Sequence, residues 1–216
     1  MRTCDTSTAD ALARLGVVAV IQVNCVDSAV KLAQTLVRVG GPAMEITLRT
    51  PVAVEAIAAI TKEVPEALIG AGTVLNVHDL ERVAQAGAQF AISPGASDDL
   101  YDAATQIDCP WIPGVATASE VMAGLDRGHH LFKFFPAEAS GGISTLKAWS
   151  GPLSEARFIP TGGVSLENAP DYLALGNVVA VGGSWMVPPA AIEDRDWAQI
   201  EALALSCLSL SPSSST

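Results

Sequence analysis

The chain has 216 residues, of which 50% are hydrophobic and 16% are charged, so it can bury one sizeable core. No apolar run reaches the length that a membrane-spanning helix needs. The formal net charge is -11 and the 12 basic residues form no cluster, which disfavours a polyanionic partner. We therefore expect a single domain that binds neither a membrane nor nucleic acid.

Two features predict a reducing, cytoplasmic location. The first residues, Met1 to Thr8, lack the basic and apolar regions of a secretory signal. The cysteines have no paired spacing, which argues against a disulfide framework or a zinc cluster, and they are Cys4, Cys25, Cys109 and Cys207. We expect no bound metal.

Met1 to Thr8 is followed by a segment with helical character, from Thr8 to Leu15, for which Ser7 or Thr8 would be the cap. Short apolar segments and segments of helical periodicity then alternate along the chain. The expected strands begin roughly two dozen residues apart, near Val17, Ala43, Ala67, Gln89, Pro110, His130, Ala156 and Asn177. The expected helices between them include 28–39, 51–63, 79–86, 98–105, 118–125 and 169–175.

This regular alternation predicts the α/β class, and within it a (βα)8 TIM barrel with an additional N-terminal helix. The barrel would be a single domain over residues 1–208, followed by a disordered Ser-rich tail at 209–216. An open, doubly wound parallel sheet is the alternative fold. A dinucleotide-binding oxidoreductase is disfavoured, because no GxGxxG turn follows Ile21.

In a barrel of this kind, the loops that follow the strands build the active site, so polar residues at strand ends are the first candidates. One of them, Lys133, lies between Phe132 and Phe134, and strand alternation directs it to the face opposite the two aromatic rings. Desolvation there favours the neutral amine, which can attack a ketone carbon and form a Schiff base. Simple pairing of the lysine with a buried carboxylate is the alternative.

The second expected strand places Glu45, Thr47 and Arg49 on one face. Glu45 is the candidate general acid and base, although an ion pair with Arg49 would also explain it. The guanidinium of Arg49 and the hydroxyl of Thr73 suit a substrate carboxylate, although both residues could equally belong to the structure of the rim.

Paired glycines follow the last two expected strands, at Gly162-Gly163 and at Gly182-Gly183-Ser184. Such turns let backbone N–H groups approach an anion, and a helix beginning at either turn would add its positive end. A tight turn with no ligand is the alternative. The sequence thus predicts a phosphorylated ligand.

Several stretches resemble the KDPG/KHG aldolase family, where KDPG is 2-keto-3-deoxy-6-phosphogluconate and KHG is 4-hydroxy-2-oxoglutarate. They are colinear from about residue 7 to about residue 205, and they comprise residues 45–50, 70–75, 92–95, 132–138, 160–163 and 182–185. The resemblance implies a class I aldolase that cleaves KDPG to pyruvate and glyceraldehyde 3-phosphate, without a cofactor and as a homotrimer.

The resemblance gives the Schiff base to Lys133 and acid/base work to Glu45. It gives the pyruvate carboxylate to Arg49 and Thr73, and the walls of the pyruvyl pocket to Pro94 and Phe135. It implies that the substrate phosphate is bound by the glycine turns, at Gly162, Gly163, Gly183 and Ser184.

One departure from the family concerns the first strand, where members commonly carry a proline and a nearby basic residue. This chain has Ala19 and then Gln22-Val23-Asn24, with no positive charge. The alternatives are therefore KHG or the galactonate epimer of KDPG as substrate, or a phosphate-binding barrel without catalysis.

Overall fold

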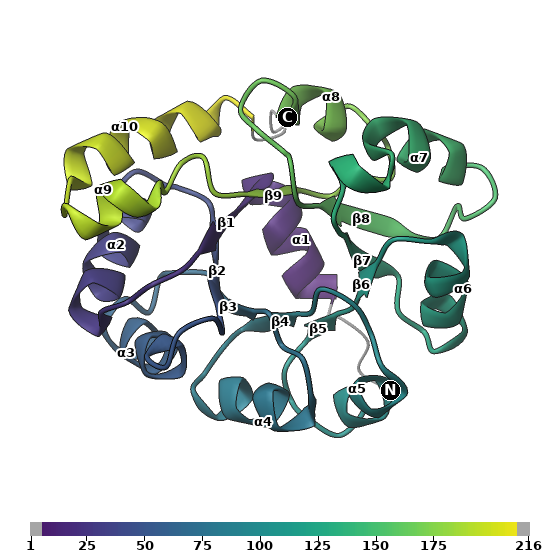
Figure 1. Cartoon of the computed structure of the whole chain (residues 1–216), viewed down its shortest axis with the longest axis horizontal. Helices are drawn as coiled ribbons and strands as arrows, with labels where there is room; N and C mark the ends of the chain where they lie inside the picture. Colours follow the sequence, from purple (N-terminus) through teal and green to yellow (C-terminus); the bar gives the residue numbers. More distant parts are fainter. Residues whose placement is uncertain (1–5, 211–216) are drawn as a thin grey trace.

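The computed structural model describes residues 6–210, in which helices surround a central set of strands (Figure 1). The strands are β1 (Val17–Ile21), β2 (Ala43–Thr47), β3 (Ile69–Gly72), β4 (Phe90–Ile92), β5 (Trp111–Ile112), β6 (Gly114–Val115), β7 (Leu131–Phe134), β8 (Arg157–Pro160) and β9 (Val181–Gly183). The helices are α1 (Thr6–Leu15), α2 (Val26–Arg38), α3 (Ala53–Glu63), α4 (Val77–Gln85), α5 (Asp98–Ala104), α6 (Ala118–Asp126), the short 3-10 helix η1 (Glu138–Ser140), α7 (Gly142–Trp149), α8 (Ala169–Leu173), α9 (Pro189–Glu193) and α10 (Trp197–Leu208). None of these helices is both long enough and apolar enough to cross a membrane.

The strands pair in parallel and curl around a common interior. Six of them form one sheet in the order β5-β4-β3-β2-β1-β9, and β6-β7-β8 form a second sheet. Isolated bridges from Phe158 to Val178 and from Thr161 to Gly182 link β8 to the segment around β9. The fold is therefore α/β, with a curled parallel sheet whose outer side is covered by helices (Figure 1).

Strand alternation divides the apolar residues into two cores. One core lies between the sheet and the outer helices, and the other fills the interior toward the amino ends of the strands. In the interior, Phe90 occupies space that exists because Gly70 has no side chain, since a Cβ there would overlap the ring. Leu12 of α1 joins this inner core and is fully buried.

The predicted strands are confirmed, each beginning at or within a few residues of its expected position. The fifth is divided into β5 and β6 at Pro113, which has no N–H to donate to a ladder, although its carbonyl accepts from the Lys133 N–H at 2.9 Å. The predicted cap of the first helix is wrong, because α1 begins at Thr6 and Ser7 and Thr8 lie inside it.

The expected Ser-rich tail falls mostly outside the described residues, which end at Leu210. Cys4 also lies outside them, whereas Cys25, Cys109 and Cys207 are free thiols. Within residues 6–210, His, Cys, Asp and Glu form no group of three or more that could hold a metal ion.

Candidate active site

Lys133 lies in the middle of β7 and points to the interior, as strand alternation predicts. Its neighbour Phe132 packs against Phe158, with 6.1 Å between the ring centroids. The Phe132 ring also leaves no room for a Cβ on Gly124 of α6. Phe134 packs against Trp149 of α7 at 5.3 Å. Because these rings occupy the outer side of β7, the lysine side chain extends to the opposite side.

Glu45 of β2 meets Lys133 across the interior. Nζ of Lys133 donates to Oε1 of Glu45 at 2.9 Å, and the two side chains are 7% and 2% exposed. The sequence left open an ion pair between Glu45 and Arg49, but the partner of Glu45 is Lys133. Because a buried ion pair is costly to desolvate, this pair is the first candidate for a chemical role in the interior.

Gly72 ends β3 beside Glu45, and Thr73 is the next residue in the chain. A Cβ on Gly72 would overlap Oε1 of Glu45, so the absence of a side chain makes room for the carboxylate. Thr73 follows in the left-handed region at φ 61°, which a β-branched residue rarely adopts. Strain of this kind persists where the surrounding structure enforces it, often at functional sites.

Pro94 and Phe135 lie around the same lysine. The centroid of the Phe135 ring is 5.4 Å from Nζ of Lys133. Gly114 of β6 is the register partner of Lys133. A Cβ on Gly114 would overlap the backbone of Pro94, so the two residues are in close contact. The half-buried Phe135 side chain therefore lies beside the amine, and Pro94 lies next to β6, the strand that pairs with β7.

The two glycine segments lie side by side, because Thr161 forms a bridge to Gly182. The second segment differs from the prediction, since Gly182 and Gly183 lie inside β9 and only Ser184 follows the strand. Gly162 and Gly163 have φ angles of 98° and 81°, and the Cβ position of Gly162 is 3.4 Å from Cδ2 of Phe135. This contact connects the first turn to the residues around Lys133. Gly183 is buried at the end of β9, and Ser184 after it is exposed.

A helix beginning at either turn would have added its positive end, but neither turn opens a helix, and α8 begins at Ala169, where the sequence predicted a helix start. After Gly163, a turn at 165–168 precedes α8, which begins only at Ala169. After Ser184, a turn closed by a bond from the Val187 N–H to the Ser184 carbonyl at 3.0 Å precedes α9 at Pro189. No helix N-terminus therefore adds its positive end directly at either turn.

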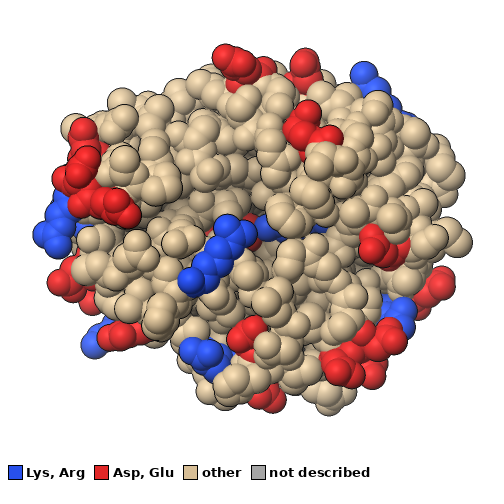
Figure 2. Space-filling view, in the orientation of Figure 1, with Lys and Arg blue, Asp and Glu red and all other residues tan. Residues whose placement is uncertain are grey.

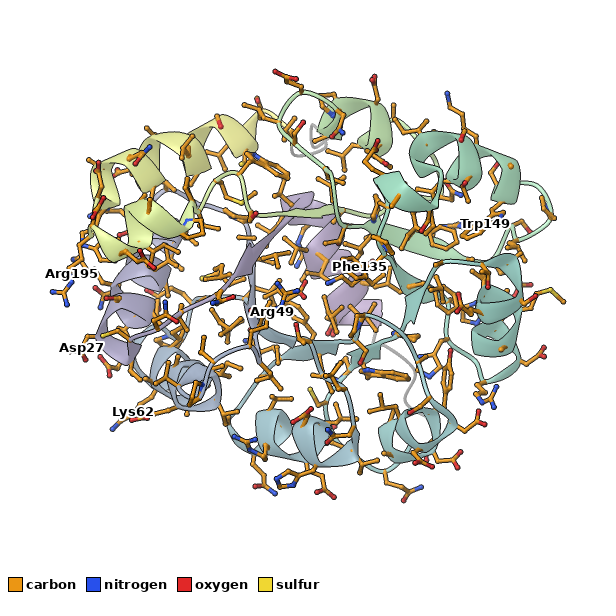
Figure 3. The ribbon with its side chains drawn as sticks, in the orientation of Figure 1. Asp27, Arg49, Lys62, Phe135, Trp149 and Arg195 are labelled. Atoms are coloured by element: carbon orange, nitrogen blue, oxygen red, sulfur yellow. The ribbon has the colours of Figure 1, made fainter. Side chains whose placement is uncertain are left out.

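Arg49 lies beyond the end of β2, which stops at Thr47, so it is a turn residue and not a strand residue as predicted. It is exposed, and Figure 3 shows it near the middle of the ring of elements, in the same region as Phe135. In Figure 2 basic side chains cross the hollow at the centre of this face, whereas most carboxylates lie around its edge. This distribution favours an anionic ligand despite the net charge of -11.

The loop after β1 carries no cation, as the sequence showed. Gln22 and Asn24 are exposed and line a cavity of about 320 Å³ with residues of α9 and with Arg195. Figure 3 shows Arg195 at the outer edge of the molecule and directed away from the centre. Arg195 therefore does not replace the missing basic residue at the mouth of the site.

The structure adds residues that the sequence analysis did not select. The carboxylate of Glu138 accepts a short hydrogen bond from the hydroxyl of Tyr172, and Nδ2 of Asn168 donates to the Gly163 carbonyl at 3.1 Å. Gly72 is a further residue of this kind. Glu138 and Gly72 lie inside stretches that resemble the family, so the signal was present but carried no role.

A buried lysine paired with a carboxylate, at the centre of a curled parallel sheet and beside a turn suited to an anion, defines the class of enzymes that can form an imine with a carbonyl substrate. Comparison with known proteins narrows this class. A profile of KDPG and KHG aldolases matches residues 9–203 of the chain. The chain belongs to the KDPG and KHG aldolase family.

Three similar proteins illustrate the relationship. The KHG/KDPG aldolase of Escherichia coli is 52% identical over 94% of this chain and 96% of the relative. The KDPG aldolase of Legionella pneumophila, solved with pyruvate captured as a covalent carbinolamine, has a TM-score of 0.90 and 44% identity over 95% of this chain and 98% of its own. The corresponding enzyme of Zymomonas mobilis, solved with 3-phosphoglycerate, has a TM-score of 0.89 and 42% identity over 96% and 98%.

Proposed function

We propose that this protein is a class I aldolase that cleaves KDPG to pyruvate and glyceraldehyde 3-phosphate through a Schiff base on Lys133. The observation that carries the proposal is the buried contact of 2.9 Å between Nζ of Lys133 and Oε1 of Glu45. The Legionella relative, with pyruvate held as a covalent carbinolamine, supports the same chemistry.

In the first half of the reaction, Lys133 transfers a proton to Glu45 and attacks the C2 carbonyl of the substrate as a neutral amine. The resulting carbinolamine loses its hydroxyl as water, and Glu45 returns the proton to this leaving group. An iminium ion then joins C2 to Nζ. Its positive charge can accept the electron pair of the bond that breaks next.

In the second half, the carboxylate of Glu45 takes the proton from the C4 hydroxyl. The bond between C3 and C4 breaks, C4 becomes the aldehyde of glyceraldehyde 3-phosphate, and the electron pair passes into the iminium to give an enamine. Glu45 returns the proton to C3. Water then hydrolyses the iminium, which releases pyruvate and regenerates the amine.

The remaining predicted residues would bind the two ends of the substrate. Arg49 and Thr73 would hold the C1 carboxylate, and Pro94 and Phe135 would form the walls around the three pyruvyl carbons. The phosphate would be bound by backbone N–H groups of the two turns and by one hydroxyl, from Gly162, Gly163, Gly183 and Ser184. Neutral donors would therefore carry the phosphate, which accords with the lack of a cation after β1.

We further propose that the curled sheet is a complete (βα)8 barrel with α1 added at its amino end, forming a single domain over residues 1–208. Counting β5 and β6 as one strand interrupted at Pro113 gives the eight strands of such a barrel, and the bridges between β8 and β9 support its closure. The resemblance to the family supports a homotrimer in the cytoplasm. Sedimentation analysis would test the trimeric state.

Two related substrates remain as second candidates, because the name of the Escherichia coli relative includes KHG and because the galactonate epimer differs from KDPG at one hydroxyl. Comparing kcat/KM for KDPG, the epimer and KHG on the same preparation separates them. A KHG value above the KDPG value would replace the first choice.

The test of the mechanism is mass spectrometry after borohydride reduction in the presence of pyruvate. We expect one reduced pyruvyl adduct on Lys133, its loss in a folded Lys133→Ala variant, and its retention in Lys147→Ala, where an exposed lysine of α7 is removed. A folded wild-type protein without an adduct would refute the aldolase proposal and favour a phosphate-binding barrel.

A further inference from the structure

Three carbonyl groups of the Gly162-Gly163 turn are held by hydrogen bonds from neighbouring elements. The Thr161 carbonyl accepts from the Ala137 N–H at 2.8 Å, and the Gly162 carbonyl accepts from the Glu138 N–H at 3.0 Å. The Gly163 carbonyl accepts from Nδ2 of Asn168 at 3.1 Å. The turn is thus fixed between the segment after β7 and the start of α8.

These bonds determine where the donors of the turn point. In a planar trans peptide the C=O and the following N–H point in opposite directions. Because the carbonyls are directed to Glu138 and Asn168, the N–H groups of Gly163 and Val164 face away from those residues. Among the hydrogen bonds of residues 6–210, none uses the N–H of Gly163 or Val164, so both donors are free for a ligand.

The side chain of Glu138 supports the turn from behind. A Cβ on Gly163 would lie 2.5 Å from Cγ of Glu138, so the glutamate stem lies directly against the glycine. Tyr172 of α8 is fully buried, and its hydroxyl donates to Oε1 of Glu138 in a short bond. Burial, and then the bond to Glu138 and its negative charge, raise the pKa of Tyr172, so it remains a donor at neutral pH.

Gly142, at the start of α7, completes this arrangement. A Cβ there would lie 2.8 Å from the Tyr172 hydroxyl and 3.1 Å from Oε1 of Glu138, so the bond depends on the missing side chain. Glu138 is an exposed residue, and the bond from Tyr172 keeps its carboxylate directed toward α8.

We propose that Tyr172 and Glu138 are positioning residues that hold the Gly162-Gly163 turn open for the substrate phosphate. The inference rests on the phosphate role given to this turn in the proposed function, and it extends that role to two residues that do not touch the phosphate. Their loss should weaken phosphate binding while the chemistry at Lys133 continues.

The test compares Tyr172→Phe with wild type in two measurements. The first is the Kd for inorganic phosphate, measured by calorimetric titration, and the second is KM and kcat for KDPG. We expect both Kd and KM to rise about 3- to 10-fold, the size of the net contribution of one ordinary hydrogen bond, with kcat nearly unchanged. Formation of the pyruvate adduct, which needs no phosphate, should keep its wild-type rate.

Three variants control for a general loss of packing. Tyr101→Phe removes another buried tyrosine hydroxyl, on α5, and should leave Kd, KM and kcat at wild-type values. Glu138→Ala should reproduce the effect of Tyr172→Phe, whereas Glu138→Gln retains an acceptor oxygen for Tyr172 and should restore most of the affinity.

The outcomes separate this proposal from the function on which it rests. An unchanged phosphate Kd in a folded Tyr172→Phe protein would overturn the positioning role, as would an equal loss of adduct formation. A wild-type protein that forms the adduct but binds no phosphate would also overturn it and leave the Schiff-base mechanism intact. Absence of the adduct would instead refute the aldolase function itself.

Discussion

Gly72 lies against the carboxylate of Glu45, and a single methyl group can test what that carboxylate does. A Cβ on Gly72 would overlap Oε1 and lie 2.6 Å from Cγ of Glu45. We expect Gly72→Ala to displace the carboxylate from Lys133 and to lower kcat by about 10-fold or more, because positioned proton transfer contributes about 10²- to 10⁴-fold. Steady-state kinetics with KDPG measures this loss.

A glycine-to-alanine change without an overlap serves as the control. Gly151 has no heavy atom within 4 Å of its Cβ position, so Gly151→Ala should retain the wild-type kcat. Gly72→Ala should also lower the free energy of unfolding by about 1–3 kcal/mol, because the added methyl group overpacks the site. If the folded Gly72→Ala enzyme turned over at the wild-type rate, the acid/base role of Glu45 would be wrong.

We expect the burial of His129, just before β7, to make the protein less stable in acid. It is 6% exposed, and burial lowers its pKa to about 4, assisted by the charges of His130 and Arg127. The unfolded chain binds this proton near pH 6.5, so stability due to neutral His129 is lost as the pH falls from about 6.5 to about 4. Above pH 6.5, this difference in pKa contributes about 3 kcal/mol to the free energy of unfolding.

Denaturant unfolding of His129→Phe at several pH values measures this contribution. The phenylalanine ring keeps the contacts with Tyr101 and Trp111, whose centroids lie 5.2 and 5.5 Å from the imidazole. We expect the stability of the variant relative to wild type to increase as the pH falls below 6.5. The same substitution at exposed His78 should show no such trend. Parallel pH curves for His129→Phe and wild type would contradict the assignment.

Among the helices, α6 is stabilised by a capping box at its N-terminus. The hydroxyl of Thr117 accepts from the Glu120 N–H at 3.3 Å, and the Glu120 carboxylate accepts from the Thr117 N–H at 2.8 Å. Although burial acts in the opposite direction, hydrogen bonds to the carboxylate from the Ala116 N–H and from the side chain and N–H of Thr117 lower the pKa of Glu120. Their stabilising effect is therefore present at neutral pH and is lost in acid, as the pH falls through the depressed pKa.

The capping box predicts that Thr117→Ala lowers the free energy of unfolding by about 1 kcal/mol at pH 7. The exposed Thr105 follows α5, and its hydroxyl donates to the Asp102 carbonyl at 2.8 Å. Thr105→Ala should therefore change stability by less than about 0.5 kcal/mol. Urea titration of both variants distinguishes them, and an equal effect would show that the cap contributes nothing specific.

Element boundaries were predictable where local chemistry determines them. Ser97 and Thr117 accept from backbone N–H groups three residues ahead, and α5 and α6 begin at the expected Asp98 and Ala118. The expected start of α8 at Ala169 is likewise confirmed, whereas no helix begins directly at either glycine turn. Ser165 and Asn168 form their own turn before α8, and α9 begins at a Pro189 that suits a first helical position.

The candidate site was predictable to the extent that it follows from strand alternation. A period of two places Lys133 opposite two aromatic rings and Glu45 on the interior face, and both expectations agree with the geometry. Gly72 beneath Glu45 depends on the register of β2 and β3, and the bond from Tyr172 to Glu138 joins residues 34 positions apart. Neither register nor long-range packing is encoded in a local pattern.

For the whole molecule, α1 closes the interior at the amino ends of the strands, where Leu12 packs with apolar residues from several strands. Leu12 is fully buried, so Leu12→Ala should cost about 2–5 kcal/mol, or about 2–4 °C in Tm for each kcal/mol in a chain of this size. The pair of Lys133 and Glu45 lies deeper along the strands, so kcat at 25 °C should remain at its wild-type value.

Calorimetry and steady-state kinetics on Leu12→Ala test this separation of stability from catalysis. Leu205→Ala on α10 is the matched control, because its side chain is 48% exposed and its loss should change Tm by about 1 °C or less. Equal Tm values for the two variants would mean that α1 does not close the inner core. A reduced kcat in folded Leu12→Ala would mean that the amino end of the interior is coupled to the position of Lys133.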